Sequence, residues 1–354
     1  MHAQQRTKSD QLFFPDRPAF SRDLVPGALS RCRQQLGASR TPQGRWLDLL
    51  TDQADSQYLV TAYAGALLCD DVDRPGLAVE ASDSLFPIEQ QPGRLLPGVT
   101  LALGLRLQKR SSAHQPVATP RAWLDYQDAD GGWVAYRDVA ALRQQLGGRE
   151  EQDLSGWTST HACITALNAW VLREFSACTA AYAASCAWLL TRQEPDGSWP
   201  AYWWSSPLFS TAYAVLALGN TPAHHAAVQR ASRWLLAGQQ ADGSWHVQGR
   251  PSAYYTALVL QALLAGPDQA DSPPLEAAAA WLVSQQMTDG SWPATALLRL
   301  PEPAAQQPDS LAPANPSPFG LNVVLVDHNR VLTTAAAYSA LRAYYQRQVL
   351  QQAA

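Results

Sequence analysis

The sequence predicts an all-α protein whose repeated helical hairpins close into an α/α barrel of the α6/α6 toroid type. Three observations support this: a tryptophan–glycine motif that occurs four times, apolar helices that contain Thr-Ala pairs, and a regular repeat length. Gly197, Gly243 and Gly290 lie 46 and 47 residues apart, a period typical of helical hairpins. Inner helices that are apolar on nearly all sides favour closure, because an open array would bury them less completely.

The tryptophan–glycine motif consists of a Trp-Leu pair, a Gln and a Gly-x-Trp turn. Its copies are 123–133, 188–199, 234–245 and 281–292, and they contain eight of the thirteen tryptophans. The first half has helical spacing, and the glycine tolerates the positive φ that ends a helix. We interpret the motif as a link between adjacent hairpins, in which the Gln side chain accepts a hydrogen bond from the buried indole. Gly44-Arg-Trp46 is a worn copy without the Gln.

Two kinds of helix are predicted to alternate. Helices apolar nearly all round and rich in small residues are expected to form the inner layer. Outer helices such as 226–238 and 274–286 combine polar residues with one apolar stripe. The stretch 70–120 is interpreted as a degenerate hairpin with a buried helix at 97–105. The Thr-Ala pairs of the inner helices begin at Thr61, Thr165, Thr211, Thr256 and Thr334.

The domain organisation follows from the limits of these repeats. Residues 1–27 are polar with scattered prolines and predict an N-terminal arm, with the first helix starting at Ala28. Residues 28–350 are expected to form a single barrel domain. The stretch 301–318 contains six prolines and cannot be helical, so we expect a surface loop near the last inner helix that could cover an opening.

Composition limits the classes of binding partner and the cellular compartment that the sequence is compatible with. A net charge of -4 with 16% charged residues gives no basic footprint for nucleic acid. The five cysteines form neither a disulfide framework nor a CxxC pair, which favours a reducing, cytoplasmic setting. No apolar run approaches the ~20 residues needed to cross a bilayer, and the first ten residues do not read as a signal peptide. We therefore expect no stable membrane insertion.

The tryptophan–glycine motif followed by Thr-Ala helices resembles the QW repeat of squalene-hopene cyclases and of related prenyltransferase and squalene-oxidase repeat proteins. The resemblance extends over roughly residues 28–345 and implies the barrel fold. In class II terpene cyclases of this family, an Asp-x-Asp-Asp motif immediately precedes such a Thr-Ala pair, and its central Asp protonates an alkene or epoxide. None of the five Thr-Ala pairs has an Asp among the four residues before it. The resemblance thus implies a barrel whose acid lies elsewhere.

Two groups of residues raise the question of a metal. Asp70, Asp71 and Asp73 follow an inner helix, so we interpret them as a solvated helix end, with a metal–diphosphate role as the alternative. Protein prenyltransferase β subunits share the barrel and hold zinc with an Asp-x-Cys and a later His.

His161, Cys163 and His328 resemble that zinc set. The alternative is that Cys163 packs as a small apolar residue while His161 makes local hydrogen bonds. We expect neither a metal nor a cofactor.

The N-terminal ends of the inner helices are expected to form a mouth with an aromatic wall. Such a wall suits an isoprenoid or polyene, because it offers apolar area and π faces that stabilise a cation; the alternative is that the aromatics simply fill a wide core. The catalytic candidates are His161, Asp327, His328 and Asp55, although Asp327-His328 also fits an ordinary turn. The substrate-binding candidates are Tyr58, Cys163, Trp203, Trp204, Phe209, Tyr254, Tyr255 and Arg330.

These observations lead to one functional hypothesis and two alternatives. We expect a non-standard terpene-cyclase-like enzyme that cyclises or isomerises an apolar polyene, isoprenoid or polyketide-like small molecule by acid/base catalysis. The first alternative is a zinc- or Mg-dependent prenyltransferase-like enzyme. The second is a non-catalytic lipid-binding or scaffold protein that has kept the barrel.

Overall fold

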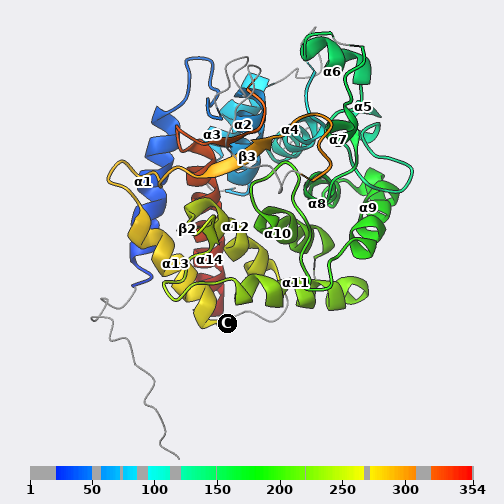
Figure 1. Ribbon diagram of the computed structural model, residues 1–354. Helices are drawn as coiled ribbons and strands as arrows, with labels where there is room; N and C mark the ends of the chain where they lie inside the picture. The colour runs from blue at the N-terminus through cyan, green and yellow to red at the C-terminus, as the bar shows by residue number, and fades with distance from the viewer. Residues whose placement is uncertain are drawn as a thin grey trace, which may run out of the picture.

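The computed structural model describes residues 21–49, 57–71, 75–85, 95–111, 121–148, 150–219, 221–266, 272–307 and 320–352. Six helices form an inner ring in which each packs against the next and the last packs against the first (Figure 1). This closed ring confirms the predicted α/α barrel. In ring order the inner helices are α2 (Gln57–Leu68), α4 (Gly98–Ser111), α8 (Ala162–Leu172), α10 (Pro207–Leu218), α12 (Ala253–Ala265) and α14 (Val331–Gln352).

An outer layer of helices surrounds this ring, as the alternation of helix types predicts. Its longer members are α1 (Leu24–Ala38), α3 (Gly76–Leu85), α9 (Thr179–Thr191), α11 (His225–Ala237) and α13 (Pro273–Gln285). Helix α1 begins at Leu24 rather than at the expected Ala28, because Pro26 lies in the first turn, where its missing N–H costs nothing. The short helices are α5 (Arg121–Leu124), α6 (Val139–Gln145), α7 (Ser155–Thr158), η2 (Ser176–Cys178) and η3 (Pro222–His224).

The Gln of each tryptophan–glycine motif joins its own turn to the next outer helix. Gln193 Nε2 donates to the carbonyl of Gly197 and to that of Ala227 on α11, both at 2.9 Å. In the last copy, Gln286 Nε2 donates to Ala28 O of α1 at 2.9 Å, which closes the outer layer as well. The motif therefore links adjacent hairpins, as predicted.

The predicted indole–Gln hydrogen bond is wrong. Trp199 Nε1 donates instead to the backbone carbonyl of Leu189 at 2.8 Å, at the end of the preceding outer helix. The Gln193 carbonyl oxygen is taken by Arg230, and its amide group by backbone carbonyls, so the side chain is saturated. Even Trp46 of the worn copy donates its indole N–H to a helix end, at Leu36 O (2.9 Å).

The Thr of the Thr-Ala pair fastens four inner helices, α2, α8, α10 and α12, to the motif before them. Thr211 Oγ1 accepts from the backbone N–H of Trp199 at 3.0 Å, and Thr256 Oγ1 accepts from that of Trp245 at 2.9 Å. Thr61 makes the same contact with Trp46 at 3.0 Å. In these four helices the two repeated sequence features thus form one structural unit that positions the helix against the motif turn.

A β-hairpin that the sequence did not lead us to expect crosses the mouth. Strands β3 (Ala296–Leu300) and β4 (Val323–Val326) pair antiparallel, and β3 also pairs with the segment before α10, where Ser205 N–H donates to Leu297 O at 2.8 Å (Figure 1). The following segment 301–307 reaches α7, where Trp157 Nε1 donates to Pro301 O at 3.0 Å. The hairpin and the segment 301–307 together therefore cover the N-terminal ends of the inner helices.

The predicted proline-rich loop falls partly within this cover. Its residues 308–319 lie outside the described residues. A second, small hairpin pairs β1 (His246–Val247) with β2 (Arg250–Pro251) in the turn before α12.

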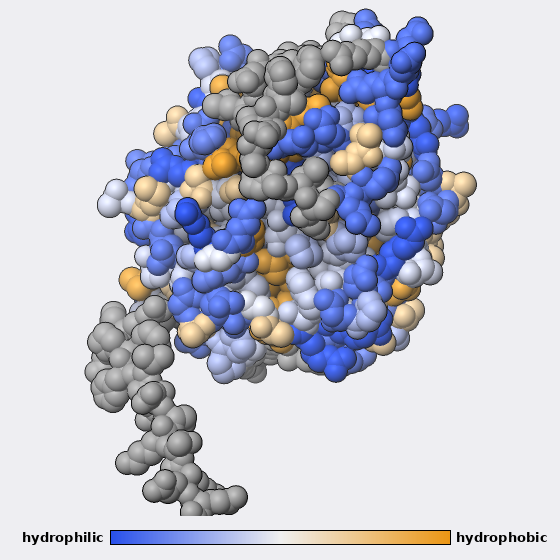
Figure 2. All heavy atoms as spheres, in the orientation of Figure 1, coloured by the Kyte–Doolittle hydropathy of each residue, from blue (hydrophilic) through white to orange (hydrophobic). Residues whose placement is uncertain are grey.

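Apolar side chains are gathered inside the two helical layers, and hydrophilic residues cover most of the face in Figure 2. Six tryptophans of the motif copies are fully buried, and they anchor the outer layer to the inner one. No helix among the described residues has both the length and the hydrophobicity of a membrane span. The fully buried tryptophans are Trp46, Trp123, Trp133, Trp199, Trp245 and Trp292.

Replacing Gly243 with alanine is expected to destabilise the fold by about 3 kcal/mol or more. Gly243 has a φ of +92°, and a Cβ there would lie 2.5 Å from Ala277 O on α13. Gly249 provides the control, because it also has a positive φ (+74°) but a Cβ added there would meet no atom within 4 Å; its alanine variant should lose only about 1 kcal/mol. Urea denaturation measures both losses, and equal losses would contradict the close approach.

Candidate functional site

A stack of aromatic rings lies where the inner helices begin. Trp204, in the segment before α10, stacks on Phe209 with ring centroids 3.9 Å apart and planes within 8°. Tyr254 of α12 lies parallel to it within 3°, with ring centroids 5.9 Å apart. All three side chains are buried. The structure therefore brings three of the predicted substrate-binding residues together into one aromatic wall.

Two further tyrosines join this wall and were not among the sequence candidates. The hydroxyl of Tyr63 on α2 lies 2.6 Å from the hydroxyl of Tyr213 on α10 and 2.6 Å from that of Tyr254. Burial raises the pKa of Tyr63 well above its usual value, so its hydroxyl stays protonated. A signal for both was present, because Thr61-Ala-Tyr63 and Thr211-Ala-Tyr213 have the same spacing within their repeats.

A second aromatic cluster surrounds His161 at the start of α8. The imidazole stacks on Tyr202 at 3.7 Å, and Trp203 packs edge-on against both rings. Nε2 lies 2.7 Å from the carbonyl oxygen of Gly156, to which it donates. Burial lowers the pKa of His161 to about 4. The imidazole is therefore neutral at pH 7, which makes it a poor proton donor.

Cys163 is fully buried beside this cluster, and burial raises the pKa of its thiol. It packs as a small apolar side chain rather than as an available thiolate. His328, the third residue of the zinc hypothesis, is exposed on the turn before α14. Across the part of the chain that the structure describes, no group of three or more His, Cys, Asp or Glu residues could hold a metal ion.

Asp327 is a fully buried carboxyl group at the start of α14. One oxygen accepts from the backbone N–H of Thr295 at 2.5 Å and the other from that of Thr333 at 2.9 Å. Burial raises the pKa of Asp327 to about 7, despite these hydrogen bonds. Its charge also contributes, after burial and neighbouring tyrosines, to raising the pKa of Tyr254. Asp327 is thus a buried carboxyl at the N-terminal end of α14, the same end of the ring as the aromatic wall.

A second buried carboxyl, Asp48, was not among the sequence candidates. It accepts from the backbone N–H groups of Leu49, Asn329 and Val331 at 3.0, 3.1 and 2.9 Å, and burial raises its pKa. Its charge contributes, after burial, to the raised pKa of Asp327. The only sequence signal was its position two residues after Trp46 of the worn motif.

The remaining candidates lie away from the aromatic wall or at its edge. Arg330 binds Asp289 of the last motif at 3.0 Å, and Tyr58 accepts from Arg45 at 3.2 Å. These contacts give both residues structural partners. Tyr255 lies inside, with its hydroxyl 2.9 Å from Ser205 Oγ. Asp55 lies outside the described residues.

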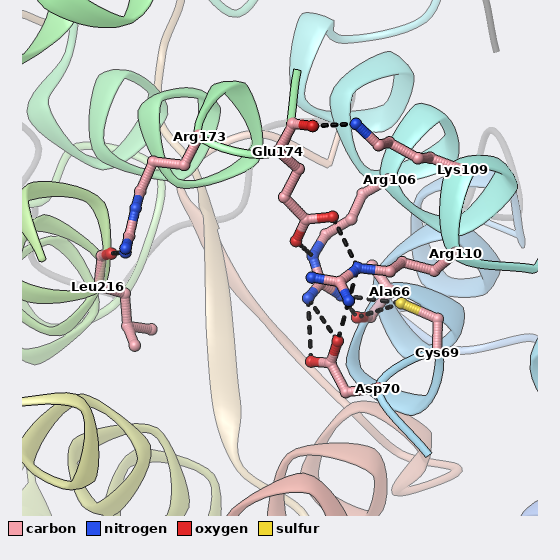
Figure 3. A network of polar contacts seen from close by, with 9 residues as sticks. All are labelled: Ala66, Cys69, Asp70, Arg106, Lys109, Arg110, Arg173, Glu174 and Leu216. Carbon is pink, nitrogen blue, oxygen red and sulfur yellow. Dashed lines mark hydrogen bonds and ion pairs between the residues drawn. The ribbon is translucent and has the colours of Figure 1, made fainter. Parts of the chain in front are cut away.

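The interpretation of the acidic cluster as a solvated helix end is wrong for Asp71, which is buried, whereas Asp70 is 39% exposed. Asp70 accepts from Arg106 through both oxygens, at 2.8 and 2.9 Å (Figure 3). Asp71 is buried between Arg33 at 3.7 Å and Arg342 at 3.3 Å. Asp70 is paired with the buried Arg106, and Asp71 with the half-buried Arg33 and Arg342. Both carboxylates are therefore engaged by arginines rather than free to ligate Mg²⁺ as the alternative requires.

Asp73, the third acid of that cluster, lies outside the described residues. The arginine network occupies the C-terminal ends of the inner helices, where cations interact favourably with the helix dipoles. The polar residues at this end thus have a structural explanation, and the candidate site is the opposite end, beneath the hairpin.

Known proteins with this architecture include terpene cyclases. The type II terpene cyclase MstE from Scytonema superposes with a TM-score of 0.79 at 23% identity, over 90% of this chain and 98% of that one. A protein from Actinoplanes gives 0.78 at 28% identity, over 90% and 99%. The ent-copalyl diphosphate synthase from Streptomyces platensis gives 0.56 at 21% identity, over 81% and 50%. A comparison with curated protein sequences finds no match.

The family model of the squalene-hopene cyclase C-terminal domain matches residues 69–252. This range covers just over half of the chain and includes the first three motif copies. The chain therefore belongs to the squalene-hopene cyclase C-terminal domain family.

Proposed function

We propose that this protein is a terpene-cyclase-like enzyme that cyclises or isomerises an apolar polyene or isoprenoid by protonating it, without an Asp-x-Asp-Asp motif ahead of a Thr-Ala pair. The observations that carry the proposal are a stacked aromatic wall at the N-terminal ends of the inner helices and a buried carboxyl, Asp327, just before the N-terminal end of α14, whose pKa burial raises to about 7. An aromatic wall stabilises a carbocation through its π faces. The five cysteines are all buried, and with neither a disulfide framework nor a CxxC pair in the sequence they support a reducing, cytoplasmic setting.

Asp327 is the proposed acid. Because burial raises its pKa to about 7, a large fraction of the carboxyl groups carry the proton at neutral pH. Once the proton has passed to a substrate alkene, the carboxylate is stabilised by the two backbone N–H donors of Thr295 and Thr333 and by the positive end of α14. This support lowers the cost of a difficult proton transfer.

The hairpin and its extension 301–307 are proposed to exclude water. A cation formed in the barrel would otherwise be captured by water, so a covered mouth favours closure of rings over hydration. His161, neutral at pH 7, is proposed as a proton acceptor rather than as an acid, because its Nε2 already donates to Gly156 and only Nδ1 can accept.

The substrate is proposed to be a polyprenyl chain, whose trisubstituted alkenes give tertiary cations on protonation. Variants of MstE, which has the same fold, have been observed with geranylgeranyl dihydroxybenzoate as substrate and with merosterolic acid A as product. Those complexes support a polyprenyl chain joined to a polar ring as the first class to test.

The test is turnover by the purified protein of a panel of polyprenyl arenes, alcohols and diphosphates, analysed by mass spectrometry and NMR. The expected product has the mass of its substrate and forms without added metal; cyclisation lowers the number of C=C bonds, whereas isomerisation moves one of them. Release of diphosphate that depends on Mg²⁺ or Zn²⁺ would support the prenyltransferase-like alternative instead. Binding without turnover of any member would support the lipid-binding alternative.

A further inference from the structure

Three tyrosine hydroxyls meet inside the inner ring. Tyr63 comes from α2 and Tyr213 from α10, which lie opposite each other in the ring order, and Tyr254 comes from α12. The Tyr63 hydroxyl lies 2.6 Å from each of the other two, and all three side chains are at most 1% exposed. The cluster is therefore a buried polar point between aromatic rings.

One of the three hydroxyl protons of this cluster is not used in a hydrogen bond. Each tyrosine hydroxyl has one proton to donate, and the chain of three hydroxyls contains two hydrogen bonds. Within the described residues, Tyr213 and Tyr254 make no other hydroxyl contact. One buried O–H group therefore has no acceptor, which is an unfavourable arrangement unless a bound molecule supplies one.

The unused proton lies on Tyr63 when both of its neighbours donate to it, and otherwise on one of the two ends of the chain. When Tyr63 donates to Tyr213, the unused proton is on Tyr213; when it donates to Tyr254, the unused proton is on Tyr254. Tyr254 is the end nearer the mouth, because it is the second residue of α12 and is parallel to Trp204. Trp204 in turn belongs to the segment that pairs with β3, where it forms a bridge with Leu298.

We propose that Tyr254 donates a hydrogen bond to an oxygen atom of the ligand, and so selects an oxygen-bearing polyprenyl chain over a hydrocarbon of the same length. That this ligand is also a substrate rests on the proposed function. The aromatic wall of Trp204 and Phe209 contacts hydrocarbon non-directionally, so a polyprenyl chain could slide along it. One fixed hydrogen-bond donor would set the depth and the direction of that polyprenyl chain. Tyr254 is thus a specificity-determining residue.

The experiment compares two ligands and two variants by equilibrium dialysis. The ligands are farnesylacetone, a polyprenyl ketone, and the hydrocarbon in which a methylene replaces its carbonyl. The measured quantity is the ratio of the two dissociation constants, so the general cost of desolvating a ketone cancels between proteins. Tyr254→Phe is expected to reduce the preference for the ketone by about tenfold, the worth of one buried hydrogen bond.

Tyr213→Phe is the matched control, because it removes the same kind of hydrogen bond from the same cluster at its other end. It is expected to change the preference by less than about twofold. Equal reductions in both variants, or none in Tyr254→Phe, would overturn the proposal. Thermal denaturation checks that both variants are folded.

A second measurement needs no variant. The carbonyl stretching band of farnesylacetone bound to the unmodified protein is expected at lower frequency than in hexane, because it accepts a hydrogen bond; an unshifted band would overturn the proposal. Both measurements concern binding alone. If they succeed while no ligand is turned over, the proposed function fails and the role of Tyr254 stands.

Discussion

Replacing Asp327 with asparagine is expected to lower turnover of the polyprenyl substrate by a factor of about 10² to 10⁴, the usual contribution of a general acid. The amide cannot supply a proton, yet it has nearly the same size and keeps one acceptor oxygen for Thr295 or Thr333. The rate constant of product formation, measured by mass spectrometry, checks this. Unchanged turnover would remove Asp327 from the role of acid.

Asp289→Asn is the matched control. Asp289 lies in the turn of the last motif, accepts from Ser291 at 2.6 and 2.9 Å and pairs with Arg330 beside the same helix start. Its side chain is 43% exposed, so its variant should retain turnover within about twofold. A loss as large as that of Asp327→Asn would indicate that the turn before α14, rather than the acid, is what matters.

The pH dependence of kcat/KM tests the same assignment of Asp327 as the acid. Because the folded-state pKa of Asp327 is about 7 through burial, kcat/KM is expected to be level below pH 7 and to fall about tenfold per pH unit above it. Stability responds in the same direction. The folded protein binds more protons than the unfolded chain between the unfolded pKa and about 7, so unfolding free energy decreases as pH rises through that window. Activity that stays level to pH 9 would contradict the assignment.

Replacing Arg106 with methionine is expected to destabilise the fold by about 3 kcal/mol or more. Its side chain is 3% exposed and binds Asp70 and Glu174 (Figure 3). Its guanidinium carbon lies 4.3 Å from the centre of the Trp170 ring. Methionine fills similar volume but leaves Glu174, only 13% exposed, without its buried partner. Asp70 is 39% exposed and can regain water, which limits the loss. Urea denaturation measures it.

Arg110 provides the control within the same network. It also binds Glu174, at 2.8 Å, but its side chain is 44% exposed. Since exposed ion pairs contribute little, Arg110→Met should cost less than about 1 kcal/mol. Losses of similar size in the two variants would show that burial of the Arg106 guanidinium is not what makes the network stabilising.

The barrel could be predicted from the sequence because the motifs that determine it are short and recur along the chain. The glycine at the motif turn, such as Gly197, needs a positive φ, and the Thr of the next helix, such as Thr211, receives the N–H of the motif tryptophan. Both features recur at a fixed spacing. A wrong hydrogen-bond partner for the indole did not matter for the fold, since any nearby carbonyl, such as that of Leu189, satisfies it.

The cover of the mouth could not be predicted, because β3 and β4 pair across a long proline-rich insertion. Neither strand has a partner nearby in the sequence, and β3 makes its other contacts with the segment around Ser205, about ninety residues earlier. Burial of Asp48 could not be predicted either, because it also depends on contacts between segments that are far apart in the sequence. Its acceptors are filled by backbone groups of Asn329 and Val331, which are close only in the folded barrel.

The candidate site was predicted in part. Trp204, Phe209 and Tyr254 do meet in one aromatic wall, since residues in the first turns of inner helices all lie at one end of the ring. Ionisable candidates such as His328 were chosen by residue type and position, and burial then separated them: His328 is exposed and Asp327 is buried. Burial of a single side chain depends on the whole ring, which no local pattern contains.

Turnover in D₂O tests the central claim, protonation of a polyene by the protein, most directly. If a carboxyl that exchanges with solvent starts the reaction, each cyclised product carries one deuterium at a carbon position and is otherwise an isomer of its substrate. Its mass is then one unit above that of product formed in H₂O, and NMR places the deuterium at the protonated alkene. A cyclised product without deuterium, formed with release of diphosphate, would contradict the account.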